Sequence, residues 1–168
     1  TINLFPGSNS TIEGPAARQQ SRTFNNGGTL NVTASGQIQN SSATFTNGGI
    51  FNLIGEPQWL DSGASFVNNG SFHKQGATGT TIWAVPFTNN SVMELSTGFL
   101  DANGGVSFLS GSTLGFPLGG TSAGSGYGQL ILPTTSTFAG ALEISLCCGF
   151  DPPPLTNYQV IAATTPIG

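Results

Sequence analysis

Two adjacent cysteines, Cys147 and Cys148, are the side chains of this 168-residue sequence that are best suited to redox or covalent chemistry. A disulfide between neighbouring residues closes a small, strained ring and departs from the usual Cα separation of about 5.5 Å. The pair leaves three interpretations open: two reduced, buried thiols near the end of a strand, a vicinal disulfide, or cross-links to another subunit. No His or further Cys lies close by in the sequence, so the two thiols do not predict a zinc site.

Residues that could perform acid–base chemistry are few and scattered. The chain has one His, and the closest grouping around it consists of His73, Lys74 and Glu94. Glu94 joins this grouping because it stands one period of the sequence repeat after His73. Isolated surface polar residues are the commoner explanation of such a grouping. We therefore expect no catalytic residues, no cofactor and no metal site, and a protein that is not an enzyme.

The two tryptophans, Trp59 and Trp83, are the residues best suited to contact a glycan, because their rings could stack on sugar rings. The alternative is that both side chains fill the interior of the fold in place of aliphatic residues. Choosing between these interpretations depends on the elements that carry the tryptophans.

Low charge is the unusual feature of the composition. Three Lys or Arg residues stand against seven Asp or Glu residues, which gives a net charge of −4, whereas about 25% of residues are charged in an ordinary domain. No basic stripe can form, so we expect no nucleic-acid binding. No apolar run reaches the roughly 18 residues that a membrane-spanning helix needs, so we expect no membrane insertion. Twelve Phe residues indicate an ordered chain in spite of 25 Gly residues.

A repeat with a fixed period organises the chain. Five phenylalanines follow one another at a constant 21-residue interval without insertion: Phe24, Phe45, Phe66, Phe87 and Phe108. An asparagine stands two places after each of the first four: Asn26, Asn47, Asn68 and Asn89. Apolar and polar residues alternate on both sides of the turn that follows, which is typical of half-buried strands.

A 21-residue unit with two short strands and a variable third segment is too small to bury its own apolar face, whereas stacked units bury it continuously. We therefore predict an all-β fold, a β-solenoid (single-stranded β-helix) of about five 21-residue coils stacked about 4.8 Å apart. The Phe residues then form an interior column, and the Asn residues pass hydrogen bonds along the turns. Charged residues would stack on like charges, which explains their scarcity.

Both ends of the chain depart from the repeat. Residues 1–22 join an apolar start, TINLF, to a stretch rich in Pro, Gly and Ser, and predict an extension or linker that could add a strand to a neighbouring subunit. The solenoid is assigned to residues 23–118. Residues 119–168 hold three further alternating segments, and we predict a C-terminal β cap, because a solenoid needs atypical end units.

The repeat FTNGGIFNL (residues 45–53) and the closing segments YGQLIL, FAGALEISL and GFDPPPLTNYQVI resemble a family of secreted proteins. These are the bacterial β-helical repeat proteins, of the type of autotransporter passengers and haemagglutinin-like adhesins. The resemblance covers about residues 24–163 and does not extend to the membrane-inserting barrel of autotransporters. It implies a β-helix, and a function among adhesins, surface scaffolds and secreted enzymes that share this fold.

These observations favour an extracellular structural protein, a β-solenoid subunit of a fibre, sheath or surface assembly. A chain that begins at Thr1, without Met, also fits a secreted or cell-surface protein. We expect self-association, either end to end or by N-terminal strand addition. The alternative function is an adhesin or carbohydrate-binding module with a glycan surface around the tryptophans, and polysaccharide cleavage is a more remote one.

Overall fold

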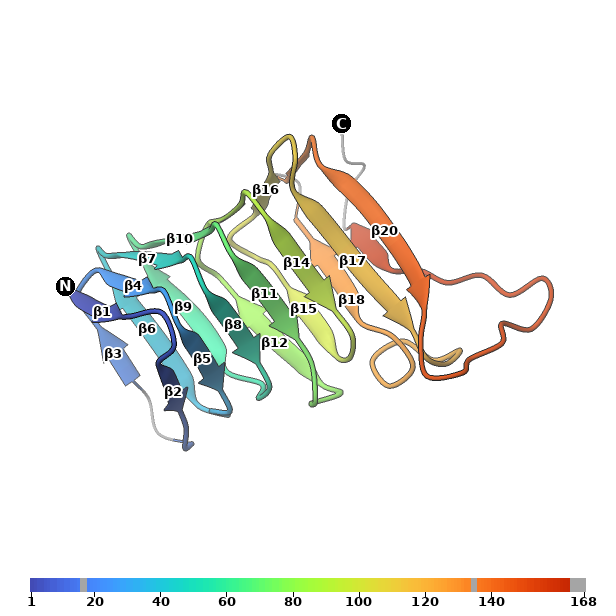
Figure 1. Ribbon diagram of the computed structural model, residues 1–168, viewed down its shortest axis with the longest axis horizontal. Helices are drawn as coiled ribbons and strands as arrows, with labels where there is room; N and C mark the ends of the chain where they lie inside the picture. The colour runs from blue at the N-terminus through green and yellow to red at the C-terminus, as the bar shows by residue number, and fades with distance from the viewer. Residues whose placement is uncertain (16–17, 134–135, 164–168) are drawn as a thin grey trace.

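The computed structural model describes residues 1–15, 18–133 and 136–163, and it confirms the predicted all-β solenoid. Within these residues, strands form three parallel sheets of seven strands each, and no helix is present. The sheets run along the length of the stack, from the N-terminus at one end to β20 at the other (Figure 1).

Each turn of the chain gives one strand to each sheet. Sheet A consists of β1 (Ile2–Leu4), β4 (Phe24–Asn26), β7 (Thr44–Asn47), β10 (Ser65–Asn68), β13 (Phe87–Asn89), β16 (Val106–Phe108) and β19 (Thr137–Phe138). Sheet B consists of β2 (Asn9–Ile12), β5 (Thr29–Val32), β8 (Ile50–Leu53), β11 (Ser71–Lys74), β14 (Val92–Leu95), β17 (Thr113–Leu118) and β20 (Ala141–Leu146). Sheet C consists of β3 (Arg18–Gln20), β6 (Gln37–Ser41), β9 (Gln58–Ser62), β12 (Thr80–Trp83), β15 (Phe99–Asp101), β18 (Gln129–Leu132) and β21 (Ile161–Ala163).

The strands from β4 to β17 lie within residues 23–118, the predicted solenoid, and with β18 they make five turns. One further turn is present at each end. The N-terminal turn corrects the expected linker, because β1, β2 and β3 pair in parallel with β4, β5 and β6 of the same chain. Gly7 and Gly14 lie at corners of this turn with φ of 82° and 95°, a conformation that glycine adopts without steric cost. Turn residues that predicted a linker therefore form corners, and the segment expected to exchange strands is already paired within its own chain.

The C-terminal region likewise continues the three sheets. The alternating segments expected to form a cap are β18, β20 and β21, with β19 preceding β20. β18 completes the sixth turn, and β19, β20 and β21 form the seventh. The described part of the predicted cap is thus the end of the solenoid itself, interrupted by two longer loops.

The interior is filled by aromatic side chains that stack from turn to turn. The rings of Phe24, Phe45, Phe66 and Phe87 follow one another with centroids 4.6, 4.9 and 4.7 Å apart, as the repeat predicts. In sheet B, the Phe51 and Phe72 rings are parallel to within 7° at 5.2 Å. Such offset contacts between stacked rings add to the free energy of burying them.

Phe108 does not belong to the predicted Phe column. Val106 is the residue paired with Phe87, and Phe108 lies opposite Asn89. The reason is the connection before β15, because residues 96–98 join β14 to β15 where the longer segment 75–79 joins β11 to β12. The corner after Phe108, residues 109–112, is longer than the corresponding corner at residues 90–91 and brings β17 back into phase with β14. Phe108 therefore ends the column of asparagines, and its ring stacks on Phe138 at 4.5 Å.

The four predicted asparagines form a buried ladder of hydrogen bonds. The Nδ2 atoms of Asn26, Asn47 and Asn68 each donate to the Oδ1 atom of the next asparagine at 2.7 Å. Each of these amides also donates to the first carbonyl of the next turn's sheet B strand, at 2.8–3.0 Å. Since all four side chains are at most 2% exposed, these bonds satisfy polar groups that would otherwise be costly to bury.

The glycines of the adjoining corner leave room for the neighbouring turn. A Cβ atom at Gly49 would collide with the carbonyl oxygen of Gly28, and one at Gly70 would collide with that of Gly49. Ile50 and Ser71 then donate their N–H groups to Gly28 and Gly49 at 2.8 Å. The close approach of the backbones explains why the repeat carries glycine beside its asparagine.

We expect the Asn68→Ala substitution to lower the free energy of unfolding by about 2–3 kcal/mol, because it leaves buried partners of the Asn68 amide unsatisfied. Asn90→Ala is the matched control, since Asn90 makes its hydrogen bond to Asn69 at the surface. Urea unfolding followed by circular dichroism measures both. Equal losses in the two variants would contradict a stabilising role of the buried ladder.

Candidate functional site

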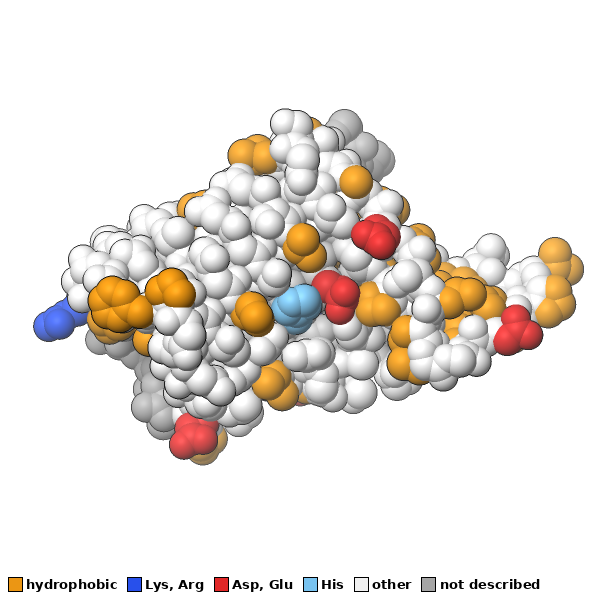
Figure 2. All heavy atoms as spheres, viewed as in Figure 1, with side chains coloured by type: hydrophobic (Ala, Val, Ile, Leu, Met, Phe, Trp, Pro, Cys, Tyr) orange, Lys and Arg blue, Asp and Glu red, His pale blue; other side chains and the backbone are white. Residues whose placement is uncertain are grey.

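The outer face of sheet B brings together two of the three residues considered for acid–base chemistry. His73 and Glu94 are paired across adjacent strands, with Nδ1 3.7 Å from a carboxylate oxygen, and both side chains are partly exposed. Figure 2 shows the histidine beside this acidic residue. Lys74 points to the opposite side, because successive residues of a strand face opposite ways. The grouping of His73, Lys74 and Glu94 is therefore not assembled.

Lys74 is a residue of the core. Its side chain is fully buried between Leu53 and Leu95, the residues paired with it in the neighbouring turns. The Nζ atom donates to the carbonyl of Ala77 at 3.5 Å. Burial lowers the pKa of Lys74, and the nearby Glu56 carboxylate opposes this shift in part.

The tryptophans lie inside the solenoid and offer no surface to a glycan. Trp59 and Trp83 are 1% and 0% exposed, and their rings stack at 4.4 Å as paired residues of β9 and β12. The prediction of a glycan contact at these two residues is wrong. Neither indole N–H has a hydrogen-bond partner among the described residues, so the two rings serve packing in the interior.

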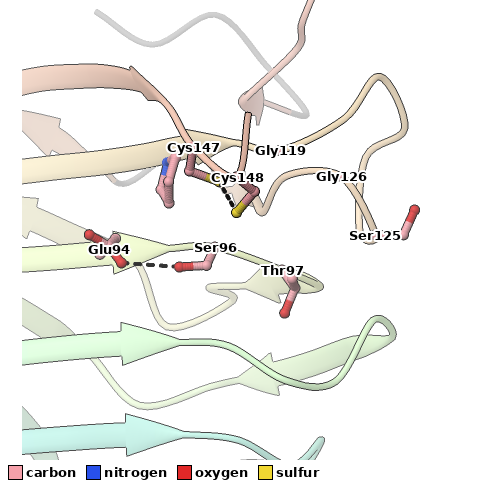
Figure 3. Close-up of a pocket in the computed structure, with 9 residues that line it drawn as sticks. Glu94, Ser96, Thr97, Gly119, Ser125, Gly126, Cys147 and Cys148 are labelled. Atoms are coloured by element: carbon pink, nitrogen blue, oxygen red, sulfur yellow. Dashed lines mark hydrogen bonds between the residues drawn. The ribbon is translucent and has the colours of Figure 1, made fainter. Parts of the chain in front are cut away.

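A hollow of about 390 Å³ lies where the regular repeat ends (Figure 3). It is bounded by the ends of β14 and β17, the loop at residues 119–128 and the residues that follow β20. Its wall carries one carboxylate, that of Glu94, to which the Ser96 hydroxyl donates at 3.0 Å. Thr97 and Ser125 add two more hydroxyl groups.

Cys147 and Cys148 form the remaining wall of this hollow. The Sγ atom of Cys148 donates to that of Cys147 at 2.8 Å, as the dashed line in Figure 3 marks. Both cysteines are free thiols, Cys147 half-buried and Cys148 exposed. The sulfur–sulfur hydrogen bond, followed by burial and the charges of Cys148 and Glu94, raises the pKa of Cys147. The structure therefore brings the two sulfurs together as free thiols, and it disagrees with the one of the three interpretations in which both thiols are buried.

The sequence carries only partial signals for this hollow. The pair of cysteines and the loop that breaks the period are both visible in the sequence, but β18, β19 and β20 separate them along the chain. Glu94, Ser96 and Thr97 come from an earlier turn, and nothing in the repeat marks them as neighbours of the cysteines. Only the stacking of three turns brings these segments together.

The C-terminal end of the stack exposes side chains that elsewhere fill the interior. Leu142, Ile144 and Leu146 of β20 are paired with Leu114, Phe116 and Leu118 of β17. The three residues of β17 are at most 4% exposed, but those of β20 are 54%, 52% and 58% exposed. Figure 2 shows apolar side chains gathered at this end, beside the segment that projects beyond β20.

The N-terminal end also presents apolar residues. Ile2 of β1 and Phe5 are 37% and 71% exposed, and Leu4 and Ile12 are partly buried against the core. β1, β2 and β3 are the first strands of their sheets, as β19, β20 and β21 are the last. Among the described residues, both ends of the solenoid thus have strand edges without a partner strand.

In the described part of the chain, no group of three or more His, Cys, Asp or Glu side chains could hold a metal ion. No helix among these residues is long and apolar enough to cross a membrane. Comparison of the chain with models of protein families, with curated proteins and with solved structures finds no match.

We expect Lys74→Met to raise the free energy of unfolding at pH 7 by about 1–2 kcal/mol, because methionine fills the column without a buried charge. The folded protein disfavours the proton of Lys74, so the wild type gains stability as the pH rises from the lowered pKa towards the unfolded value of about 10.5. The advantage of the variant should therefore shrink over that range. Chemical unfolding at pH 7, 9 and 10.5 measures it; a less stable variant, or a gap that does not change with pH, would contradict this account.

Proposed function

We propose that the chain is an extracellular structural protein whose solenoids join end to end into a fibre, sheath or surface layer. The observation that carries the proposal is the open C-terminal turn, where three apolar side chains of one strand are half exposed at positions that are buried in the turn below. The resemblance of the repeat to secreted β-helical proteins supports the extracellular setting.

A further turn stacked on β20 would bury these side chains and pair its free edge. Burial of a Leu or Ile side chain is worth about 1.5–3 kcal/mol when complete. An open edge with apolar side chains is also a template for adding another strand. The C-terminal face is therefore suited to a partner that presents parallel strands at the same spacing.

The N-terminal turn of a second copy is the partner that fits this description. β1 and β2 are the first strands of their sheets and have free outer edges. In the next turn, Ile2 and Leu4 are paired with Phe24 and Asn26. Ile12 is likewise paired with Val32. Such a contact joins different faces of two identical subunits, and because it would continue the stack along its own axis it yields an open filament. The scarcity of charged residues removes the repulsion that in-register stacking of like charges would cause.

The alternative functions have no observation of their own in their favour. The tryptophans that suggested an adhesin or carbohydrate-binding module are buried. The residues considered for polysaccharide cleavage are divided between the outside and the inside of sheet B. End-to-end assembly is therefore the function that the geometry supports best.

We expect the wild-type chain to form filaments and the Ile144→Asp variant to remain monomeric, because the aspartate would place a charge in the contact. Ser145→Asp is the matched control, since Ser145 is the next residue of β20 and faces the other way. Sedimentation velocity and negative-stain electron microscopy measure assembly. Circular dichroism confirms that both variants are folded.

A wild-type chain that stays monomeric at high concentration would contradict end-to-end assembly. Filaments of Ile144→Asp that equal those of the wild type would show that the β20 face is not the contact. Loss of assembly in Ser145→Asp alone would point instead to a lateral contact on the outer face of sheet B.

A further inference from the structure

We propose that Cys147 and Cys148 are a modification site, at which a disulfide forms and opens reversibly within one chain by exchange with a small-molecule disulfide. The inference does not depend on end-to-end assembly, since it concerns the thiols of a single subunit. It selects one of the interpretations that the adjacent cysteines leave open.

The backbone holds the two sulfurs against each other. Cys147 continues the ladder beyond β20 by donating its N–H to the carbonyl of Leu118 at 2.9 Å. The N–H of Phe150 donates back to the carbonyl of Cys147 at 2.9 Å and closes a tight turn. Because the turn is anchored to Leu118 at Cys147 and closed by its own hydrogen bond, the backbone keeps the two sulfurs 2.8 Å apart.

The conformation of Cys148 is unusual for a cysteine. Cys148 and Gly149 are the central residues of the turn, with φ of 61° and 74°. Positive φ at both central positions defines a type I′ turn, in which Gly, Asn and Asp are the favoured residues. A cysteine at the first position costs roughly 1–2 kcal/mol in backbone strain. The turn accepts that strain while directing one sulfur at the other.

The neighbouring loop leaves space for the pair of sulfurs. A Cβ atom at Gly119 would lie 3.0 Å from the Sγ of Cys147 and 3.7 Å from that of Cys148. Gly119 does not have a positive φ, so the absence of a side chain there serves the sulfurs and not the backbone. The absence of a side chain at Gly119 thus leaves room for the two sulfurs at the edge of the hollow.

The exposure of the two thiols sets the order of the steps. Cys148 is exposed, whereas Cys147 is half-buried and has a raised pKa, so the Cys148 thiolate attacks first. It bonds to one sulfur of the oxidant, of the class of glutathione disulfide, and releases one thiol. Cys147 then loses its proton and attacks the Cys148 sulfur, which expels the second thiol. In sum, two protein thiols become one disulfide, and one small-molecule disulfide becomes two thiols.

The 168-residue chain is first reduced and then incubated with mixtures of reduced and oxidised glutathione. The reaction is quenched with acid and analysed by intact mass and by non-reducing gel. We expect the wild type to lose both free thiols and two hydrogen atoms in mass, to carry no glutathione and to run as a monomer. Dithiothreitol should restore both thiols. Proteolytic peptides that contain both cysteines should carry the same loss of mass.

Two variants test the order of steps and the role of the space at Gly119. Cys147→Ser should stop at a stable glutathione adduct on Cys148, and Cys148→Ser should react at least tenfold more slowly than Cys147→Ser. Gly119→Val should prolong the glutathione adduct several-fold, because the side chain displaces the sulfurs, while circular dichroism stays unchanged.

Disulfide-linked dimers of the wild type as the main product would overturn the proposal. So would a wild type that keeps two free thiols, or a lasting glutathione adduct, at ratios where Cys147→Ser is modified. A wild type and a Cys147→Ser variant that both remain unmodified at the most oxidising ratio would likewise rule the site out. All of these measurements are made on Ile144→Asp as well, so that failure of end-to-end assembly does not affect the result.

Discussion

The buried ladder of asparagine amides is the interaction on which the rest of this structure depends. The amides of Asn26, Asn47 and Asn68 each donate both to the asparagine of the next turn and to a carbonyl at the start of the next turn's sheet B strand. A turn longer or shorter at this corner would move an apolar side chain into the ladder and leave buried polar groups without partners. The ladder therefore holds the second to fifth turns in one register. The Phe column, the glycine corners and the low charge of the chain are consistent with that register.

The regular stacking of the repeat ends where the asparagine ladder ends. Phe108 occupies the position after Asn89, and the chain then departs from the fixed period through the loop at residues 119–128 and the projecting segment after Leu146. The hollow, the cysteine pair and the exposed apolar strand all lie in this region. The regular turns form the scaffold, and the hollow, the cysteine pair and the exposed strand lie where the chain departs from the repeat.

The part of the fold that could be predicted from the sequence is the part in which successive turns keep the 21-residue spacing of the repeat. The columns from Phe24 to Phe87 and from Asn26 to Asn89 were predictable, because sheets A and B have no insertion there. Phe108 was misplaced because a shorter connection before β15 shifts β15 and β16 by two residues, and a longer corner after β16 restores the 21-residue interval, so the spacing of the phenylalanines does not show the shift. The tryptophans were uncertain because Trp59 and Trp83 are paired although the interval between them exceeds one period of the repeat, and no constant period reveals that they face inward.

The ends of the chain and the hollow show two other limits of the sequence. The N-terminal turn was interpreted as a linker, since the same Gly and Pro residues mark a flexible segment and the corners of a coil. The hollow joins residues of three turns, and only the stacking of those turns brings them together.

The central claim is that the chain builds a continuous stack by joining its two ends. X-ray diffraction from aligned assembled material tests it most directly. The account predicts a meridional reflection near 4.8 Å from strands perpendicular to the fibre axis, and an axial repeat of about 34 Å for the seven turns of one subunit. Fibres that lack the meridional reflection at about 4.8 Å, or that repeat at a spacing unrelated to seven turns, would contradict it.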